Sequence, residues 1–556
     1  MSINNSKYAY PNEFVPKHRR WPDKKLEISP AWCSVDLRDG NQALPRPMEP
    51  EQKKAFFKML VAIGFKEIEI GFPAASTDEW SFCRELIKQD LIPNDVRISV
   101  LTQARDHVIR KTMSALNGIK TACCHIYIPT SELHTRYVLR ESRNQVMKRA
   151  ISSVRLVKSL AEDMSGNVSL EFSPEEFTDT DLDFSVELCD AVVDAWGSKE
   201  KVIINLPLTV ERSLPTHYAD MIESFIEKSS MRSRSIISVH AHNDMGSAVA
   251  ATELALLAGA QRVEGTLFGN GERAGNSDIV TLALNLQYLG IDTGLDFGDI
   301  ESIEAKYSEL TSMSIHPRQP YSGSLIFTAF SGSHQDAIGK CLDKEEEIRK
   351  RFGGWKMPYL HINPEEIGRS ISGTIRINSQ SGKGGLAYVL SESYNVRLPD
   401  TLLAELETYV QHRTEELSRE LRPDEIWDLL VSVFCVQESP IMLLKYWPRP
   451  DSRNPSIIHS EVHLKMRGKK YELTTKGDGP VAAFANALRQ LDIPKFKLLN
   501  YEERSIGVTV DADSITIVTL ENADGKLFHG IGFGSNIVQG AAKAIVSAIN
   551  RIMLTD

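Results

Sequence analysis

Two histidines of this chain, His240 and His242, are separated by a single residue in the run SVHAHND (residues 238–244). Residues i and i+2 of a β-strand share one face, so both imidazoles would point to the same place, while Val239 and Ala241 pack on the other side. Imidazole nitrogens are common ligands of transition metals. The spacing therefore predicts half of a metal site on a rigid strand.

Asp39 and Asn276 are the other candidate ligands. One carboxylate and two imidazoles suit Zn²⁺, Mn²⁺ or Fe²⁺ with positions left open for substrate, and an amide oxygen can add a further ligand. Arg38, next to Asp39, would stabilise negative charge that develops on a carbonyl oxygen; without a metal nearby it would form an ordinary salt bridge. Glu175 and Glu272 are candidates for proton transfer or for support of the ligands.

These residues need a scaffold that brings distant segments together. Short apolar, β-rich runs alternate with longer helical patterns, at residues 31–35, 67–70, 96–101, 123–128, 168–172, 202–206, 236–239 and 262–267. Strands alternating with helices in this way are typical of a parallel (β/α)₈ TIM barrel. A doubly wound open sheet has the same alternation, but it usually carries a glycine-rich turn after the first strand. Here that position holds the charged run DLRDGNQ (residues 36–42), which favours the barrel.

Polar residues cluster where the expected strands end. Except for His125, which falls within its strand, they follow a strand directly: Arg38, Asp39, Ser173, Glu175, Asn205, Thr209, His240, His242 and residues 270–276. Barrel enzymes build their sites on this face. Two histidines on a strand are more often packed in a core than bound to a metal. The acidic residue after the first strand, and barrel closure beside the seventh and eighth, favour the metal site instead.

Length and composition restrict the possible classes of protein. A chain of 556 residues exceeds the roughly 250–300 residues that one core supports, so two or more domains are expected. The net charge of -10 argues against a nucleic-acid surface, and no apolar run approaches the roughly 18–20 residues of a membrane span. The N-terminus shows no secretory signal, and the seven cysteines form no CxxC pair, which indicates reduced thiols in a cytoplasmic setting.

The last part of the chain, from about residue 440, looks duplicated. Expected strands at 461–466 and 470–474 precede a helix at 481–491, and strands at 514–520 and 527–530 precede a helix at 537–553. Each of these two ββα units has a glycine turn before its helix, which indicates a compact pseudo-symmetric α/β domain. Because it carries no cluster of titratable groups suited to catalysis, small-molecule binding or dimerisation is its expected role.

Three motifs resemble the signatures of one enzyme family. DLRDGNQ (residues 36–42), HAHND (240–244) and GNGERAGN (269–276) are similar to motifs of 2-isopropylmalate synthases and of the related homocitrate and citramalate synthases. RWP (20–22), NLPLTVE (205–211) and FSGSHQD (330–336) resemble the longer class of 2-isopropylmalate synthases. The resemblance extends from about residue 20 to the end of the chain.

The resemblance implies a Claisen-type condensation of acetyl-CoA with 2-oxoisovalerate and water, which gives 2-isopropylmalate and CoA in the first committed step of leucine biosynthesis. It also implies feedback inhibition by leucine, a divalent metal (Mg²⁺, Mn²⁺ or Zn²⁺), activation by a monovalent cation, and a cytoplasmic homodimer. The implied domains are an N-terminal extension (1–29), a catalytic TIM barrel (30–323), linking subdomains (324–439) and a leucine-binding regulatory domain (440–556).

The matching motifs also imply roles for individual residues. Asp39, His240 and His242 would hold the metal with Asn276 as a further ligand or close neighbour, Arg38 would neutralise the keto oxygen, Thr209 would bind the substrate carboxylate, His125 and Ser173 would line the pocket, and Leu101 would touch the isopropyl group. The base that takes the acetyl proton stays open among Glu175, His334 of the partner subunit and Tyr359. A neutral histidine has a suitable pKa near neutrality, whereas a glutamate needs burial to raise its pKa. We expect His334 and Glu175 to share the proton relay, in an order that stays open.

Three alternatives accompany this interpretation. A sister synthase would use pyruvate or 2-oxoglutarate and differ only in its side-chain pocket, where one methylene is worth about 1–3 kcal/mol. No second cationic group is evident near the expected acyl pocket, which weakens the dicarboxylate alternative. Metal-dependent acyl-CoA lyases share only the barrel motifs. A leucine-binding protein with a silent barrel would not need intact Arg38, Asp39, His240 and His242.

Overall fold

The computed structural model describes residues 14, 16–197, 199–328, 332–370, 383–417, 419, 421–505, 514–534 and 537–555. Most of the first half of the expected N-terminal extension lies outside this part, as do the first two residues of the FSGSHQD motif. The chain divides into two compact units. The first comprises Met1–Ile326 with Glu365–Arg369, and the second comprises Phe327–Pro364 with Ser370–Asp556.

The first unit is a closed parallel barrel whose strands β1 to β8 follow one another in chain order. The strands are β1 (Ala31–Ser34), β2 (Glu67–Glu69), β3 (Arg97–Gln103), β4 (Thr121–Pro129), β5 (Asn167–Glu175), β6 (Val202–Leu208), β7 (Ser235–Ala241) and β8 (Arg262–Gly265). β8 pairs with both β7 and β1, which closes the barrel. This arrangement confirms the predicted TIM barrel.

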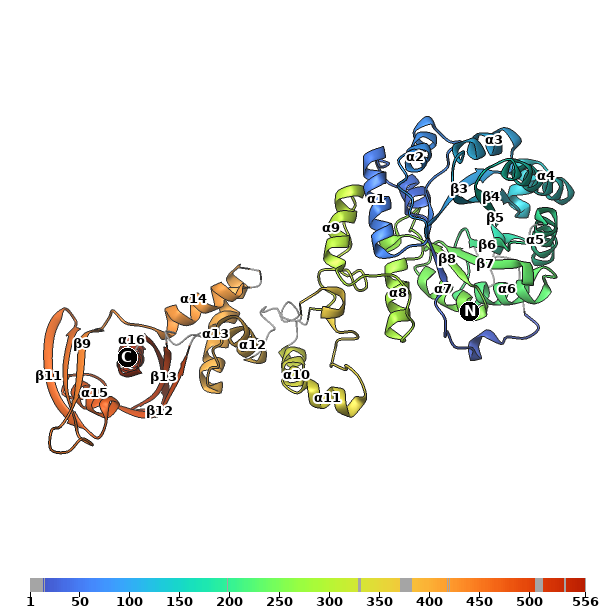
Figure 1. The fold of residues 1–556 in the computed structure, drawn as a ribbon. Coiled ribbons are helices and arrows are strands. Elements are labelled where there is room, and N and C mark those ends of the chain that lie inside the picture. The colour runs from blue at the N-terminus through green and yellow to red at the C-terminus, as the bar shows by residue number, and fades with distance from the viewer. Residues whose placement is uncertain are drawn as a thin grey trace. The chain divides into compact units, whose positions relative to one another are not determined.

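Helices surround these strands (Figure 1). They are α1 (Pro50–Ile63), α2 (Thr77–Lys88), α3 (Asp106–Ala115), α4 (Arg143–Glu162), α5 (Leu182–Trp196), α6 (Pro215–Lys228), α7 (Ala248–Ala258), α8 (Ile279–Tyr288) and the added α9 (Ile300–Thr311). Shorter helical turns η1 (Trp21–Asp23), η2 (Asp36–Gly40), η3 (His134–Leu139), η4 (Phe177–Asp179), η5 (Arg232–Arg234) and η6 (Leu267–Gly269) lie in the connections, and η7 (Pro364–Ile367) includes part of the segment that returns to this unit. The strands are buried almost throughout because helices cover them from outside.

The barrel interior contains charged side chains as well as apolar ones. Glu69 on β2, Glu171 on β5, and Arg262 and Glu264 on β8 are each at most 1% exposed. Groups of this kind are buried only when they are paired. Arg262 donates hydrogen bonds to both Glu171 (3.1 Å) and Glu264 (2.6 Å). A paired ionic cluster therefore lies inside the barrel, among strands that also carry the predicted site residues.

The second unit begins with helices and ends with two antiparallel sheets. Its helices are α10 (Gly332–Leu342), α11 (Glu345–Phe352), α12 (Lys383–Tyr394), α13 (Asp400–Leu417), α14 (Pro423–Phe434), α15 (Pro480–Leu488) and α16 (Ile537–Thr555). One sheet has the order β11-β10-β9, from β9 (Ile441–Pro450), β10 (Ile458–Met466) and β11 (Lys469–Gly477). The other has the order β12-β13-β14, from β12 (Phe496–Ser505), β13 (Ser514–Asn522) and β14 (Leu527–Gly534).

The duplication is present, but each repeat has three strands where the sequence predicted two. The missed strands, β9 and β12, both lie at sheet edges. β9 carries Pro448 and Pro450, and β12 carries charged residues such as Glu502 and Arg504. Edge strands tolerate prolines and charges that a central strand excludes, and the same features hide them from a hydrophobic pattern.

Apolar packing joins the linking helices to the second sheet. Residues of α12, α13 and α14 share one buried cluster with Ile515 and Ile517 of β13 and Ile531 of β14. The helix α16 packs on β13 and β14, and also contacts β9. Removal of the chain after residue 439 would therefore expose the apolar faces of helices that precede the cut.

All seven cysteines are free thiols. Within the described ranges, no helix has the length and apolar character needed to cross a membrane.

Candidate active site

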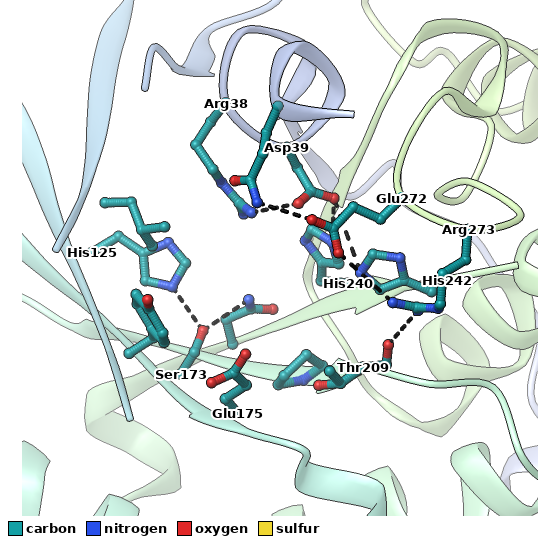
Figure 2. Close-up of a pocket in the computed structure, with 15 residues that line it drawn as sticks. Arg38, Asp39, His125, Ser173, Glu175, Thr209, His240, His242, Glu272 and Arg273 are labelled. Atoms are coloured by element: carbon teal, nitrogen blue, oxygen red, sulfur yellow. Dashed lines mark hydrogen bonds and ion pairs between the residues drawn. The ribbon is translucent and has the colours of Figure 1, made fainter. Parts of the chain in front are cut away.

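A cavity of about 180 Å³ lies at the C-terminal ends of the barrel strands. It is lined by Arg38, Asp39, Gln42, Leu101, His125, Tyr127, Ser173, Glu175, Asn205, Pro207, Thr209, His240, His242, Glu272 and Arg273 (Figure 2). Cavities for drug-sized ligands usually measure about 300–1,000 Å³, so this one suits a small molecule or one end of a larger one. The face is the one that the sequence predicted.

The turn η2 places two of the predicted residues. Immediately after β1 the chain forms this π-helical turn, a form that is often found at functional sites. Asp36, the first residue of the turn, accepts a hydrogen bond from the backbone N–H of Leu267 (3.0 Å). This bond connects the end of β1 to the end of β8. Arg38 and Asp39 then follow within the same turn and reach the cavity.

Asn276 is positioned by the glycine-rich loop after β8. Its backbone N–H donates to the carbonyl of Gly269 (2.9 Å), and the residue forms an isolated bridge with His242. A Cβ at Gly271 would lie 2.2 Å from the Asn276 amide nitrogen, and one at Gly275 would lie 2.0 Å from the Gly269 carbonyl oxygen. Side chains at these positions would therefore push the loop away from the strand ends.

Asp39, His240 and His242 form a group that fits a divalent metal. Their candidate ligand atoms all lie within 4.8 Å of one another, and Asp39 Oδ2 is 3.7 Å from His240 Nε2 and 3.9 Å from His242 Nε2. Asn276 lies beside them and donates its amide N–H to Asp39 (2.9 Å). In the described part of the chain, His242 Nδ1 and Asn276 Oδ1 are buried without a hydrogen-bond partner. Unsatisfied buried polar atoms beside a carboxylate and two imidazoles fit a site that is completed by a bound cation.

Opposing charges set the protonation of this group. Burial alone would raise the pKa of Asp39, but the Arg38 guanidinium and His240 hold it well below its usual range. Burial lowers the pKa of His240, but hydrogen bonds with Asp39 and Glu264 outweigh it and raise the value to about 9. Burial and the charge of His240 together lower the pKa of His242 to about 4. In the metal-free chain one imidazole is thus charged and the other neutral.

One wall of the cavity is a chain of hydrogen bonds between strands. His125 Nδ1 lies 2.7 Å from Glu69 Oε2, and its Nε2 lies 2.7 Å from Ser173 Oγ. Asn205 donates to the same Ser173 oxygen (3.0 Å). Glu69 also pairs with Arg38 Nε, while Arg38 Nη1 donates to Asp39 (2.8 Å). Glu69 therefore fixes both the arginine and the histidine on this wall of the cavity.

Thr209 and Arg273 occupy the rim after β6 and β8. The Thr209 hydroxyl oxygen accepts the backbone N–H of Glu176 (2.9 Å), so its own O–H remains to donate. Arg273 lines the same cavity and is a second cationic group in it beside Arg38, whereas the sequence had shown none near the expected acyl pocket. Its guanidinium donates to both carboxylate oxygens of Asp244 (2.6 and 3.1 Å) and to the Thr209 carbonyl (2.7 Å). The Asp244 charge offsets that of Arg273, whose main contacts join three loops.

The candidates for proton transfer fall in both units. Glu175 lines the cavity, and burial raises its pKa. His334 and Tyr359 belong to the second unit, where their rings stack with centroids 3.8 Å apart. Tyr359 has a φ of 63°, in the left-handed region that non-glycine residues rarely adopt.

Several contributors were not predicted as site residues. Gln42, Pro207 and Arg273 line the cavity and sit inside motifs that were recognised only as wholes. Tyr127 is two residues after His125 on β4, so the two side chains lie on the same face of the strand. Glu69 was overlooked on β2, although the run EIEI (residues 67–70) alternates acidic and apolar residues. That alternation was the available signal for a carboxylate that points into the barrel.

Comparison with known proteins gives three family matches along the chain. Residues 29–306 match a family described as HMGL-like, residues 324–391 match the alpha-isopropylmalate synthase post-catalytic domain-like family, and residues 420–553 match the LeuA allosteric (dimerisation) domain. Similar proteins include 2-isopropylmalate synthases from Clostridium acetobutylicum (45% identical; 97% of each chain) and Desulfitobacterium hafniense (45%; 99% of each chain). The chain belongs to the 2-isopropylmalate synthase family.

Membership of the 2-isopropylmalate synthase family confirms the predicted enzyme class, an acyltransferase of leucine biosynthesis, and implies acetyl-CoA and a divalent metal. Among solved structures, an HMG-CoA lyase from Bacillus subtilis is 18% identical, with a TM-score of 0.43 over 52% of this chain and 96% of that chain.

Proposed function

We propose that this chain condenses acetyl-CoA with 2-oxoisovalerate and water to form 2-isopropylmalate and CoA, under feedback control by leucine. The observation that carries the proposal is the arrangement in one small cavity of Asp39, His240 and His242 beside Arg38, with the Thr209 hydroxyl free to donate. The names of the similar proteins support the same substrates.

The 2-oxo acid is held at both of its polar ends. Thr209 donates its hydroxyl proton to the substrate carboxylate, because its oxygen is already engaged by a backbone N–H. Asp39, His240 and His242 would hold the divalent metal, with Asn276 as a further ligand or close neighbour. The bound metal supplies Lewis-acid polarisation of the keto group.

Arg38 stabilises the negative charge that develops on the keto oxygen during attack. Its side chain is 13% exposed and is fixed by Glu69 and Asp39, so the guanidinium is oriented before substrate arrives. Leu101 contacts the isopropyl group, and His125 and Ser173 flank the substrate on the neighbouring strands.

Glu175 and His334 of the partner subunit relay the proton from the acetyl methyl group, assisted by Tyr359. Glu175 is suited to this because burial raises its pKa toward neutrality. The stacked His334 and Tyr359 rings keep each other in a fixed orientation. The resulting enolate carbon bonds to the keto carbon, and water then cleaves the thioester to release CoA.

The proposal extends to the organisation of the protein. We retain the division into an extension (1–29), a catalytic barrel (30–323), linking subdomains (324–439) and a leucine-binding domain (440–556). The match of the C-terminal part to the LeuA allosteric (dimerisation) domain supports leucine as effector and a homodimer. Activation by a monovalent cation and a cytoplasmic location stay predictions.

A thiol-release assay with acetyl-CoA and a panel of 2-oxo acids tests the reaction. We expect the largest kcat/KM with 2-oxoisovalerate, loss of CoA release with a chelator, and recovery on addition of Mg²⁺, Mn²⁺ or Zn²⁺. His242→Ala should fold and release no CoA. A preference of tenfold or more for pyruvate or 2-oxoglutarate would assign a sister synthase instead. If the protein binds leucine but releases no CoA from acetyl-CoA with any of the 2-oxo acids, it would be a regulatory protein with a silent barrel.

A further inference from the structure

Glu264 on β8 lies directly beneath the proposed metal ligands. Its side chain is 1% exposed, and its Oε2 lies 3.0 Å from Nδ1 of His240. Asn205 donates to the same oxygen (3.2 Å), while Arg262 (2.6 Å) and Ser238 (3.3 Å) donate to Oε1. Both carboxylate oxygens are thus fully occupied by donors.

These contacts fix the state of the imidazole. A carboxylate that accepts a hydrogen bond from the Arg262 guanidinium is ionised and can only accept, so Nδ1 of His240 must be the donor. A metal ligand must be the neutral imidazole; with the proton kept on Nδ1, its Nε2 lone pair faces the centre of the ligand group, where Nε2 lies 3.7 Å from Asp39 Oδ2. The Arg262 side chain, 1% exposed, holds Glu264 from below.

Glu264 is also linked to the substrate wall. The Asn205 amide that donates to Glu264 donates in addition to Ser173 Oγ (3.0 Å), which in turn lies 2.7 Å from His125 Nε2. A single buried carboxylate therefore joins a proposed metal ligand to two residues proposed to flank the substrate.

Glu264 does not itself belong to a second metal site. His125, Glu171 and Glu264 bring ligand atoms close enough to hold a cation. However, Arg262 Nη1 lies between the two carboxylates, 3.1 Å from Glu171 and 2.6 Å from Glu264. A fixed guanidinium supplies the positive charge that a metal would bring there, so the chemistry of this cluster is that of an ion pair.

We propose that Glu264 is a positioning residue, which holds the Nδ1 proton of His240, aims Nε2 at the metal and couples that ligand through Asn205 to the substrate wall. The inference rests on the metal site of the proposed function. Carboxylates that orient metal-bound histidines typically change metal affinity 10–100-fold when they are replaced.

Direct metal titration tests this role without any substrate. Metal-free protein is titrated with Mn²⁺, and free Mn²⁺ is followed by electron paramagnetic resonance. We expect Glu264→Gln to raise the Mn²⁺ Kd about 10–100-fold, because a glutamine cannot accept from Arg262, Ser238, Asn205 and His240 together. Glu264→Asp keeps the charge that Arg262 needs but shortens the side chain. It should weaken binding in the same direction even if the glutamine variant fails to fold.

Glu171→Gln is the matched control. Glu171 is equally buried and accepts from the same Arg262, but it makes no hydrogen bond to His240. Glutamine keeps the length of Glu171 and a side-chain oxygen that can still accept from Arg262. We expect a Kd within about threefold of the wild type.

Two results would overturn the role of Glu264. One is a folded Glu264 variant with a Kd within threefold of the wild type, and the other is an equal weakening by Glu171→Gln, which would indicate a general disturbance of the core. The thiol-release panel judges the proposed reaction separately. Wild-type protein that binds Mn²⁺ but releases no CoA would refute that reaction and leave the positioning role of Glu264 measurable.

Discussion

Replacement of Arg38 by lysine separates transition-state stabilisation from binding. The guanidinium uses two different edges, Nε toward Glu69 and Nη1 toward Asp39 at 2.8 Å. A lysine ammonium is a single point that cannot span both carboxylates and also reach a substrate oxygen. Removal of one donor to a developing oxyanion costs about 10²–10³ in kcat, or about 2.7–4 kcal/mol. We therefore expect Arg38→Lys to lower kcat by about 10²–10³ with little change in KM for the 2-oxo acid.

Lysine is preferable to alanine here because it retains a charge. Glu69 and Asp39 are at least nine-tenths buried, and loss of the cation that they share would cost about 3–5 kcal/mol of stability and confuse the result. The assay is thiol release at saturating substrates, with the Mn²⁺ Kd measured on the same preparation. Arg97→Lys, at the opposite end of β3 from the cavity, is the matched control and should keep kcat within about twofold. A kcat for Arg38→Lys within tenfold of the wild type, with unchanged metal binding, would refute the assignment.

Two other substitutions test the packing around the cavity and in the second unit. Burial raises the pKa of Asp36 from 3.8 to about 7, so the folded barrel should lose about 1.4 kcal/mol of stability per pH unit from about pH 4 to 7. In chelated protein, Asp36→Asn should reduce the fall in melting temperature between pH 5 and 8, and equal falls would contradict the shift. A Cβ at Gly530 would lie 2.2 Å from the Ala544 carbonyl, so Gly530→Ala should destabilise the second unit by about 1–3 kcal/mol in thermal unfolding. A Cβ at Gly479 would meet open space, so Gly479→Ala should leave the stability unchanged. Equal melting temperatures for the two variants would refute the close packing of α16 on the sheet.

The barrel and its metal-capable residues could be predicted from the sequence because both depend on patterns between residues that are close together in the chain. The alternation of strands and helices can be recognised in short stretches of sequence. The spacing of His240 and His242 can be recognised within the single short segment that contains them. The position of Asp39 beside them followed from barrel closure, which is a property of the fold rather than of its details. Each of these steps survives small errors in element boundaries.

Other features depended on information that is not local. β9 and β12 were missed because edge strands need only one hydrogen-bonded neighbour and one covered face. Arg273 was not recognised as a cavity residue because its direction depends on a loop in which it adopts a φ of 55°. Its pairing with Asp244 joins two loops, and the two residues are 29 positions apart in the chain. Sequence spacing alone does not predict a contact of this kind.

The buried charges under the cavity were missed for a different reason, since their signal was present in the sequence. Glu67 and Glu69 alternate with isoleucines, and Arg262 and Glu264 flank Val263. Such barrels usually fill their interior with valine, isoleucine and leucine. Charged residues at alternate positions of a strand are therefore interpreted as residues at a strand end or on the protein surface. An apolar interior would be at least as stable, because a buried ion pair rarely repays its desolvation. What the charges supply is orientation: Glu69 fixes Arg38 and His125, and Glu264 fixes His240. Alternating charges within an otherwise apolar barrel strand therefore predict the groups that hold an active site in place, one layer below the residues that perform the chemistry.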